Sequence, residues 1–371
     1  MIIRSSIQLS RFIGAGGIKN YQISTWNFSE NDGFLATKVV KRSISTSSKQ
    51  SVVIPTASSL VAASPPNIQP YLQIMRVDKP IGTWLLYWPC TWSIAMAAPA
   101  GQLPSIYMLS LFGAGAFLMR SAGCVINDLW DKDFDKKVER TKLRPLACGS
   151  LSEKQAVGLL AGLLSTSLAI LMQLNWYSVA VGASSMLLVV GYPLAKRYTY
   201  WPQFVLGLTF NWGALLGWTA IRGDLSSSSA PLWMYAAALQ WTLIYDTIYA
   251  HQDKADDIMI GVKSTALRLG KDTKKWLSAF GIGTVASLTA CGMASDQTWP
   301  YYVALAATSA QLGWQIGTVD IDNGTDCWNK FKSNSWMGII LFAGIVASTL
   351  LKEDEKKKKP ATNDSNFLLD A

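Results

Sequence analysis

The chain has 371 residues, of which 50% are hydrophobic and only 15% are charged, and its formal net charge is +9. Apolar runs of about 17 to 25 residues, the length that the hydrocarbon core of a bilayer requires, recur along it. This composition excludes an ordinary soluble enzyme and predicts an all-α, polytopic membrane protein. A single histidine, His251, and five cysteines without CxxC spacing argue against a histidine-based metal site, a zinc site or a disulfide framework.

The segment 1–60 differs in kind from the rest of the chain. It is rich in Lys, Arg and Ser, and its only acidic residues are Glu30 and Asp32. This composition is typical of a mitochondrial transit peptide, which is removed or disordered. We predict targeting here rather than an ordinary disordered tail. The Pro-containing stretch Ser64–Pro70 then predicts a linker.

A membrane domain is predicted at residues 61–351, followed by a charged tail at 352–371. Some of its helices contain Gly or Pro, which membrane helices tolerate. The apolar runs predict about nine membrane helices, at residues 81–98, 104–126, 155–172, 176–192, 203–221, 232–250, 276–294, 299–318 and 336–351.

Charge in the loops predicts the orientation of these helices. The loops after the second, fourth, sixth and eighth helices are rich in Lys and Arg, whereas Arg222 is the only basic residue in the short loops on the other side. By the positive-inside rule, the basic loops and the N-terminus lie in the matrix of an imported protein. The basic tail Lys352–Lys359 would emerge on the opposite side, so the last span is the one that breaks the rule.

The first acidic motif reads N-D-L-W-D-K-D-F-D and follows the apolar run Tyr107–Met119. If the helix continues, Asn127, Asp131 and Asp135 fall at i, i+4 and i+8 on one face. Carboxylates placed this closely repel one another unless a cation lies between them. Hard oxygen ligands suit Mg²⁺, which takes part of its shell from one or two carboxylates and a substrate's phosphates.

A second acidic motif follows the apolar run that ends near residue 250. On a continuous helix, Asp246, Asp253 and Asp257 would share one face at i, i+7 and i+11, with Asp256 beside them. One such cluster alone has an equally good explanation as a solvated helix end. Two clusters, each at the edge of a membrane-length run, favour a functional site, because charges there are costly.

Basic residues accompany both motifs at the same predicted membrane face. Arg offers a planar fork that matches carboxylate or phosphate, and Lys offers a point charge. The positive-inside bias also requires cations here, so each of these residues could serve either ligand binding or only the orientation of the protein in the membrane. These residues are Arg76, Lys79, Arg140, Arg144, Lys196 and Arg197.

Acidic groups for a metal, with cations between them, predict a site for a diphosphate at the membrane surface. An apolar interior behind that site suits a substrate with a long hydrocarbon tail, which describes a polyprenyl diphosphate. Metal and cations would stabilise the charge that develops on the departing diphosphate as the allylic C–O bond breaks. The resulting carbocation can alkylate an electron-rich acceptor, which composition and spacing do not identify. We expect no nucleic-acid partner.

The first motif resembles the NDxxDxxxD signature of the UbiA superfamily of intramembrane prenyltransferases, and D-T-I-Y-A-H-Q-D-K-A-D-D resembles the second aspartate motif of that family. More narrowly, M-R-V-D-K-P-I-G-T-W, R-S-A-G-C-V-I-N-D, R-T-K-L-R-P-L, Y-P-L-A-K-R and G-V-K-S-T-A-L-R-L-G are similar to its branch that prenylates 4-hydroxybenzoate in ubiquinone synthesis. The resemblance implies helices around a central cavity, bound Mg²⁺ and a lateral opening for the isoprenoid. It also suggests other ubiquinone-synthesis enzymes as partners.

The resemblance assigns candidate roles position by position. As metal ligands it implies Asn127, Asp131, Asp135, Asp253 and Asp257. The candidate catalytic residues are Asp131, Asp135, Asp253, Asp257 and Lys196. The candidate substrate-binding residues are Asn127, Asp128, Arg76, Arg144, Tyr192, Arg197, Asp246 and Asp256.

The carboxylate of 4-hydroxybenzoate needs a cation that is not occupied by diphosphate. Arg76, Arg144 and Arg197 are the candidates, and Arg197 is preferred because Lys196 can serve the diphosphate. Two alternatives to this enzyme remain: a non-catalytic carrier of diphosphate lipids, and a relative that prenylates homogentisate, a naphthoate or haem. The nearly uncharged far loops argue against the carrier, and the R-S-A-G-C and K-S-T-A-L segments argue against the other acceptors through resemblance alone.

Overall fold

The computed structural model describes the backbone of residues 7–13 and 19–25, and residues 56–352 apart from five side chains, those of residues 193, 194, 196, 256 and 260. Residues 1–55 and 56–371 form separate units. In the first unit, β1 (Ile7–Ile13) pairs with β2 (Lys19–Thr25) as an antiparallel hairpin in which Ile7 lies opposite Thr25. The targeting role of residues 1–60 stays a prediction.

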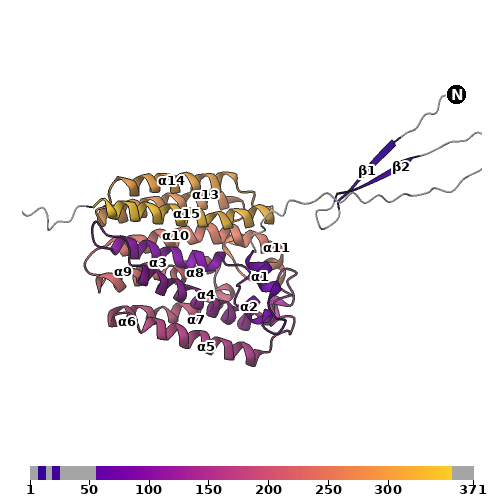
Figure 1. Ribbon diagram of the computed structural model, residues 1–371, viewed down its shortest axis with the longest axis horizontal. Helices are drawn as coiled ribbons and strands as arrows, with labels where there is room; N and C mark the ends of the chain where they lie inside the picture. Colours follow the sequence, from indigo (N-terminus) through magenta and orange to yellow (C-terminus); the bar gives the residue numbers. More distant parts are fainter. Residues whose placement is uncertain (1–6, 14–18, 26–55, 353–371) are drawn as a thin grey trace, which may run out of the picture. The chain divides into compact units, whose positions relative to one another are not determined.

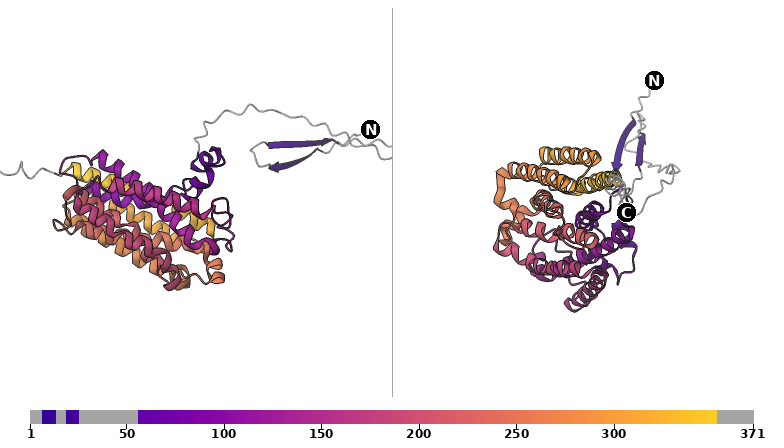
Figure 2. Two further views of the ribbon diagram at one scale, coloured as in Figure 1. Left: turned by 90° about the horizontal axis from the view of Figure 1, so that it is seen from below. Right: turned by 90° about the vertical axis from the view of Figure 1, so that its left-hand side faces the viewer.

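The second unit is a bundle of helices that run along a common direction (Figures 1 and 2). Two short helices, α1 (Ala57–Ala63) and α2 (Gln69–Ile74), precede the first long one and flank the predicted linker. The long, unbroken helices of the bundle are α3 (Ile81–Ala97), α4 (Ile106–Asp135), α5 (Glu153–Leu171), α10 (Ala230–Ala250), α13 (Thr273–Ala294), α14 (Trp299–Thr318) and α15 (Gly324–Leu350). Two further stretches are each divided into a pair of shorter helices: α6 (Trp176–Ser184) with α7 (Met186–Tyr198), and α8 (Pro202–Phe210) with α9 (Trp212–Arg222).

Each predicted membrane helix has a helical counterpart, which confirms the all-α membrane fold. Among the described residues, five helical stretches are long and apolar enough to cross a bilayer, so the number of nine spans stays a prediction. These stretches are 106–135, 153–171, 202–222, 265–294 and 324–350.

Two predicted continuous helices are broken. The first breaks at Ser185, whose hydroxyl donates to the Gly182 carbonyl at 2.6 Å. The second breaks at Asn211, whose amide donates to the Gly207 carbonyl at 2.7 Å and to Thr242 Oγ1 at 2.8 Å. Such side chains compete with the backbone for carbonyl groups and bend or interrupt helices.

Two other helices are longer than predicted. Helix α4 continues through the whole first acidic motif to Asp135. Helix α15 begins at Gly324 rather than near residue 336, and the side chain of Asn323 accepts hydrogen bonds from the backbone N–H groups of Thr325 and Asp326 at its start. The extra turns hold Lys330, which is 6% exposed and lies with its Nζ 3.6 Å from the centre of the Trp314 ring.

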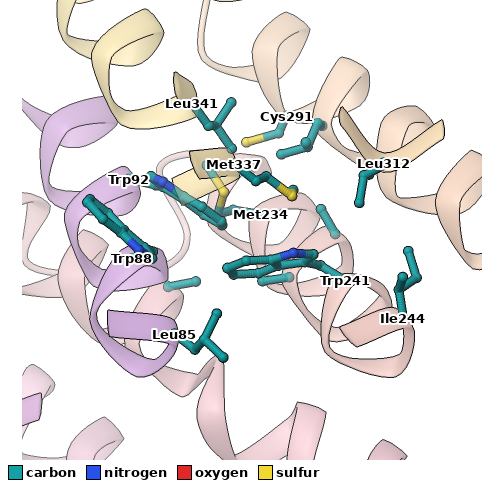
Figure 3. Close-up of a cluster of buried hydrophobic side chains, with 14 of the residues drawn as sticks. Leu85, Trp88, Trp92, Met234, Trp241, Ile244, Cys291, Leu312, Met337 and Leu341 are labelled. Carbon is teal, nitrogen blue, oxygen red and sulfur yellow. The ribbon is translucent and has the colours of Figure 1, made fainter. Parts of the chain in front are cut away.

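The largest apolar core joins α3, α9, α10, α13, α14 and α15 (Figure 3). The rings of Trp92 and Trp241 lie 5.2 Å apart at its centre, and both side chains are at most 1% exposed. Trp92 Nε1 donates to the Gly338 carbonyl and Trp241 Nε1 donates to Asn334 Oδ1. These bonds satisfy the indole donors that burial would otherwise leave unpaired.

Candidate functional site

A cavity of about 850 Å³ lies among the helices α3 to α10. Its polar part includes Asp78, Asn127, Arg144, Tyr192 and Asp246, which come from both acidic motifs, from two loops and from α7. The rest of its wall is largely apolar and includes Leu86, Phe112, Leu168, Ile170, Val189 and Leu216. One chamber therefore joins a charged end to a hydrocarbon-like interior.

The first acidic motif lies on α4, as the sequence predicts. Because α4 is a single helix to Asp135, Asn127, Asp131 and Asp135 share one face. Asn127 and Asp128 line the cavity. Asp131 is half-buried, and Asp135 is buried.

Arginines from two loops hold the buried carboxylates of α4. Arg76 Nη2 donates to both oxygens of Asp128 at 2.8 Å, and Arg144 Nη1 donates to Asp128 at 3.2 Å and to Asp135 at 2.8 and 3.0 Å. Asp128 is only 1% exposed. Fixing a buried carboxylate with two guanidinium groups ties the α2–α3 and α4–α5 connections together.

Arg76 adopts a left-handed backbone conformation, with φ at +59°. This region is unfavourable for a residue with a Cβ atom. The Arg76 side chain bonds to the Gln73 carbonyl as well as to Asp128, which offsets the strain. The turn into α3 is therefore held by the same arginine that reaches the acidic motif.

The second acidic motif differs from its predicted geometry. Asp246 lies on α10 and lines the cavity, but the α-helix ends at Ala250. A 3₁₀ turn, η1 (His251–Asp253), and a new helix, α11 (Lys254–Ile260), follow. The prediction that Asp246, Asp253 and Asp257 lie on one face of a continuous helix is therefore wrong. The side chains of His251 and Gln252 hydrogen-bond to the Thr247 and Tyr249 carbonyls, which favours the end of α10 there.

Arg140 connects the two motifs. Its Nε donates to Asp253 Oδ1 at 2.6 Å, its Nη2 donates to Asp253 Oδ2, and its Nη1 donates to the Tyr249 hydroxyl at 3.1 Å. Arg140 follows the first motif in sequence and lines the cavity. Both motifs therefore meet at one end of the bundle, where α1, α2 and α11 also lie (Figure 1).

The remaining predicted residues fall into three groups. Tyr192 lines the cavity, and Asp257 is half-buried on α11. The side chains of Lys196 and Asp256 lie outside the described part of the chain. Arg197, the preferred acceptor cation, is exposed and outside the cavity wall: its guanidinium lies over the rings of Trp130 and Phe134, at 5.7 and 5.4 Å.

A cation that the sequence analysis did not single out lies deeper in the cavity. Arg120 is seven residues before Asn127 on α4, lines the cavity and lies 5.9 Å from the Phe210 ring centre. Its Nη1 contacts Cys124 Sγ, its Nε is buried without a hydrogen-bond partner, and none of the ion pairs among the described residues involves it. An unpaired Arg inside a membrane helix marks a functional site by default. The arginine of the R-S-A-G-C segment lies within an apolar stretch, and this feature of the sequence could have identified Arg120 as a candidate site residue.

Gly82 makes room for this arginine. A Cβ atom built on Gly82 would lie 2.3 Å from Arg120 Nε and 2.7 Å from Arg120 Nη2. Such distances are far below van der Waals contact, so the guanidinium occupies the space that a side chain would fill. The glycine in the P-I-G segment at the start of α3 therefore leaves the space that the Arg120 guanidinium occupies.

Burial changes the acid–base behaviour of two groups beside the site. Burial lowers the pKa of Lys79, an effect that Asp78 opposes and that Arg76, Arg140 and Arg144 reinforce. Burial also lowers the pKa of His251, which is 7% exposed. Its Nδ1 is 2.8 Å from the Thr247 carbonyl and its Nε2 is 3.4 Å from Thr273 Oγ1, so the ring joins α10 to α13 and supports the wall of the site.

The donor chemistry of this end fits a hard divalent cation, since it consists of carboxylate and amide oxygens. Among the described residues, no three His, Cys, Asp or Glu side chains converge closely enough to hold a metal by themselves. A cation bound here would complete its coordination with water and substrate oxygens, which is the usual manner of Mg²⁺.

The model of the UbiA prenyltransferase family matches residues 86–341. The chain belongs to this family. Over 314 residues it is 90% identical to a Caenorhabditis elegans protein named mitochondrial 4-hydroxybenzoate polyprenyltransferase, which covers 84% of this chain and 88% of that protein. A human protein of the same name is 57% identical over 309 residues, or 83% of each chain.

Solved structures of UbiA homologues share the fold. The apo structure of a UbiA homologue from Aeropyrum pernix K1 has a TM-score of 0.62 and 25% identity, covering 72% of this chain and 97% of that one. A UbiA homologue from Archaeoglobus fulgidus bound to GPP and Mg²⁺ has a TM-score of 0.54 and 15% identity, covering 75% of this chain and 99% of that one. At that identity the second likeness concerns the fold alone.

Proposed function

We propose that the chain transfers a polyprenyl group from polyprenyl diphosphate to position 3 of 4-hydroxybenzoate, ortho to the hydroxyl group, and releases diphosphate as a membrane step of ubiquinone biosynthesis. The observation that carries this proposal is the cavity whose charged end includes residues of both acidic motifs, Asn127 and Asp246, and whose remaining wall is largely apolar. The names of the close relatives support the same reaction.

The charged end suits the diphosphate. Asn127, Asp131 and Asp135 on α4, with Asp253 and Asp257 beside α10, would hold Mg²⁺ through oxygen ligands. When bound, Mg²⁺ neutralises charge on the leaving diphosphate. Arg140 and Arg144 line the same end, so their guanidinium groups can exchange a carboxylate for phosphate oxygens, which they bind with similar geometry.

The apolar wall suits the isoprenoid tail. Leu164, Leu168 and Leu171 of α5 face the cavity together with Met186 and Val189 of α7. Burying hydrocarbon against such a wall gains roughly 25 cal/mol for each Å² removed from water. The wall also keeps water away from the allylic carbocation, which water would otherwise quench.

Arg120 suits the carboxylate of the acceptor better than the arginines named from sequence. Arg76 and Arg144 hold Asp128 and Asp135 at the charged end, where the diphosphate would lie, and Arg197 lies outside the cavity. Arg120 lies deeper in the chamber, beside the aromatic ring of Phe210, with its Nε lacking a partner. A guanidinium group binds a carboxylate through two parallel hydrogen bonds, so it would orient the ring as well as hold it.

The decisive experiment supplies purified protein with Mg²⁺, one polyprenyl diphosphate and a panel of aromatic acceptors, and identifies products by mass spectrometry. We expect prenylated 4-hydroxybenzoate, with formation stopped by EDTA and restored by added Mg²⁺. If only homogentisate or a naphthoate is prenylated, that compound is the acceptor instead of 4-hydroxybenzoate. Binding of the diphosphate lipid without any product would favour the carrier.

We further propose that the protein lies in the mitochondrial inner membrane with the acidic motifs facing the matrix. Both close relatives are named mitochondrial, and the basic loops lie at the end that holds these motifs. Residues 1–60 fused to a soluble reporter should carry it into mitochondria, and a reporter that stays in the cytosol would contradict this. Association with other ubiquinone-synthesis enzymes stays a proposal that co-purification can test.

A further inference from the structure

Asp78 is a cavity carboxylate to which the proposed reaction gives no role so far. It lies in the turn between Arg76 and the start of α3, and its side chain lines the cavity. Its Oδ1 is buried and has no hydrogen-bond partner. Burying a carboxylate oxygen without a partner is costly, so a group of this kind requires an explanation.

Neighbouring carboxylates at this end of the bundle differ from Asp78. Asp128 is bonded by Arg76 and Arg144, Asp135 by Arg144, and Asp253 by Arg140. Each of these three accepts hydrogen bonds from a guanidinium group, so its oxygens already have partners. The buried Asp78 oxygen has no such bond, so its lone pairs are available to a proton that enters the cavity.

The position of Asp78 relative to Arg120 fits an acceptor that bridges them. Asp78 is four residues before Gly82, the residue over which the Arg120 guanidinium lies. Both residues line the same cavity, Asp78 from the turn that precedes α3 and Arg120 from the middle of α4. An aromatic acid held by its carboxylate at Arg120 can therefore direct the ring positions beside its hydroxyl group toward the charged end, where Asp78 lies.

Building on the proposed prenyl transfer, we propose that Asp78 is the general base that removes the ring proton. The bond between the prenyl C1 and the diphosphate oxygen breaks, and its electron pair leaves with diphosphate. The ring carbon ortho to the hydroxyl group then bonds to C1, which gives an arenium ion. Asp78 accepts the proton from that carbon, and the C–H electron pair restores the aromatic ring.

A deuterium experiment isolates this step. Purified wild type, Asp78→Asn and Asp78→Glu receive Mg²⁺, polyprenyl diphosphate and a saturating concentration of either unlabelled or 3,5-dideuterated 4-hydroxybenzoate, in separate reactions. Mass spectrometry measures how much product comes from each acceptor. Asp133→Asn is the matched control, because it removes an exposed carboxylate that lies outside the cavity and pairs with Lys136.

We expect wild type and Asp133→Asn to use both acceptors equally, because proton loss is fast when the base is present. In Asp78→Asn, turnover should fall by about 10²–10⁴-fold, the usual contribution of a general base. The remaining turnover should be several-fold slower with the deuterated acceptor than with the unlabelled one, because proton loss has become the slow step. Asp78→Glu should lose some rate but regain equal use of both acceptors.

The outcomes separate this proposal from the reaction on which it rests. Reduced turnover by Asp78→Asn that is equally fast with both acceptors overturns the role of Asp78, because proton loss is then not the step that the substitution slows. No product from wild type overturns the proposed reaction instead. If Asp78→Asn gives no measurable product, Asp78→Ala is assayed with added acetate: restored turnover supports the general base, and no restoration counts against it.

Discussion

The two sides of the bundle are built on different principles. The side made by α3, α10, α13, α14 and α15 encloses one continuous core in which Trp92, Trp241, Tyr245 and Tyr301 are at most 1% exposed. The side made by α4 to α9 has only small apolar clusters, and the large cavity lies between its helices and α3, α10 and α15. The packed side supplies stability, and the hollow side supplies space for a substrate.

The two sides also differ in the surroundings of their buried polar groups. In the packed side, Trp241 Nε1 and Asn334 Oδ1 bond to each other, although other atoms there, such as Trp218 Nε1, have no partner. On the hollow side, the unpaired atoms Asp78 Oδ1 and Arg120 Nε belong to residues that line the cavity. Unpaired groups of this kind are costly in an empty chamber and become favourable once a ligand supplies the missing bonds. Substitutions on the two sides should therefore separate stability from activity.

The largest expected effect is on the hollow side. Asp131→Ala should abolish turnover, because it removes a metal-ligand charge rather than packing. The thermal midpoint should stay close to that of wild type, since Asp131 is only half-buried. Initial rates and thermal unfolding in detergent measure both quantities.

Asp133→Ala is the control for this change, because Asp133 is an exposed carboxylate on the same helix. It should keep both activity and stability. If purified Asp131→Ala turned over at the wild-type rate, the first acidic motif would not be part of the active site.

The next effect belongs to the packed side. Trp241→Ala should destabilise the protein by about 3–5 kcal/mol, the usual cost of truncating a fully buried aromatic side chain. It also leaves Asn334 Oδ1 without its indole donor. Trp336→Ala, which truncates a 64% exposed tryptophan on α15, should cost far less. Equal loss of stability in the two variants would contradict the division into packed and hollow sides.

The sequence could predict most of the fold because length and apolarity suffice to place helices. It could not predict the breaks at Ser185 and Asn211, because these depend on hydrogen bonds to particular carbonyls and, at Asn211, to a neighbouring helix. The sequence also failed to predict that α15 begins at Gly324, because Lys330 in its first turns is charged and suggests a loop. In the structure Lys330 is buried against Trp314, a tertiary contact that the sequence does not show.

The candidate site was predicted unevenly. Asn127 and Asp246 do line one cavity, because α4 and α10, which carry them, reach the same end of the bundle. The sequence did not reveal which arginines the aspartates already occupy, since those pairs join residues up to 113 positions apart. It also directed attention to loop cations and away from Arg120, which lies inside an apolar helix.

A moderate effect should follow from changing Arg120. Arg120→Lys keeps the charge but loses the planar fork, and we expect KM for 4-hydroxybenzoate to rise about tenfold, or roughly 1.4 kcal/mol. KM for the polyprenyl diphosphate should change little. Gly82→Ala should act in the same direction, because its Cβ would displace the Arg120 guanidinium. Kinetics with each substrate varied separately measure this, and a larger effect on the donor would assign Arg120 to the diphosphate.

The smallest effect should come from Arg197, and it distinguishes the structural assignment from the one made on sequence alone. The sequence favoured Arg197 as the acceptor's cation, which would give Arg197→Lys the tenfold loss now expected of Arg120→Lys. In the structure, Arg197 Nη2 donates to the Trp130 carbonyl at 3.1 Å, and its guanidinium lies over two exterior rings. A lysine keeps a cation beside those rings, and surface changes of this kind usually stay within about 0.5 kcal/mol. We therefore expect KM for either substrate to change by no more than about twofold, because 0.5 kcal/mol corresponds to roughly that ratio. Measured side by side, a tenfold rise for Arg197→Lys with none for Arg120→Lys would mean that the C-terminal turn of α7 moves into the cavity when substrate binds.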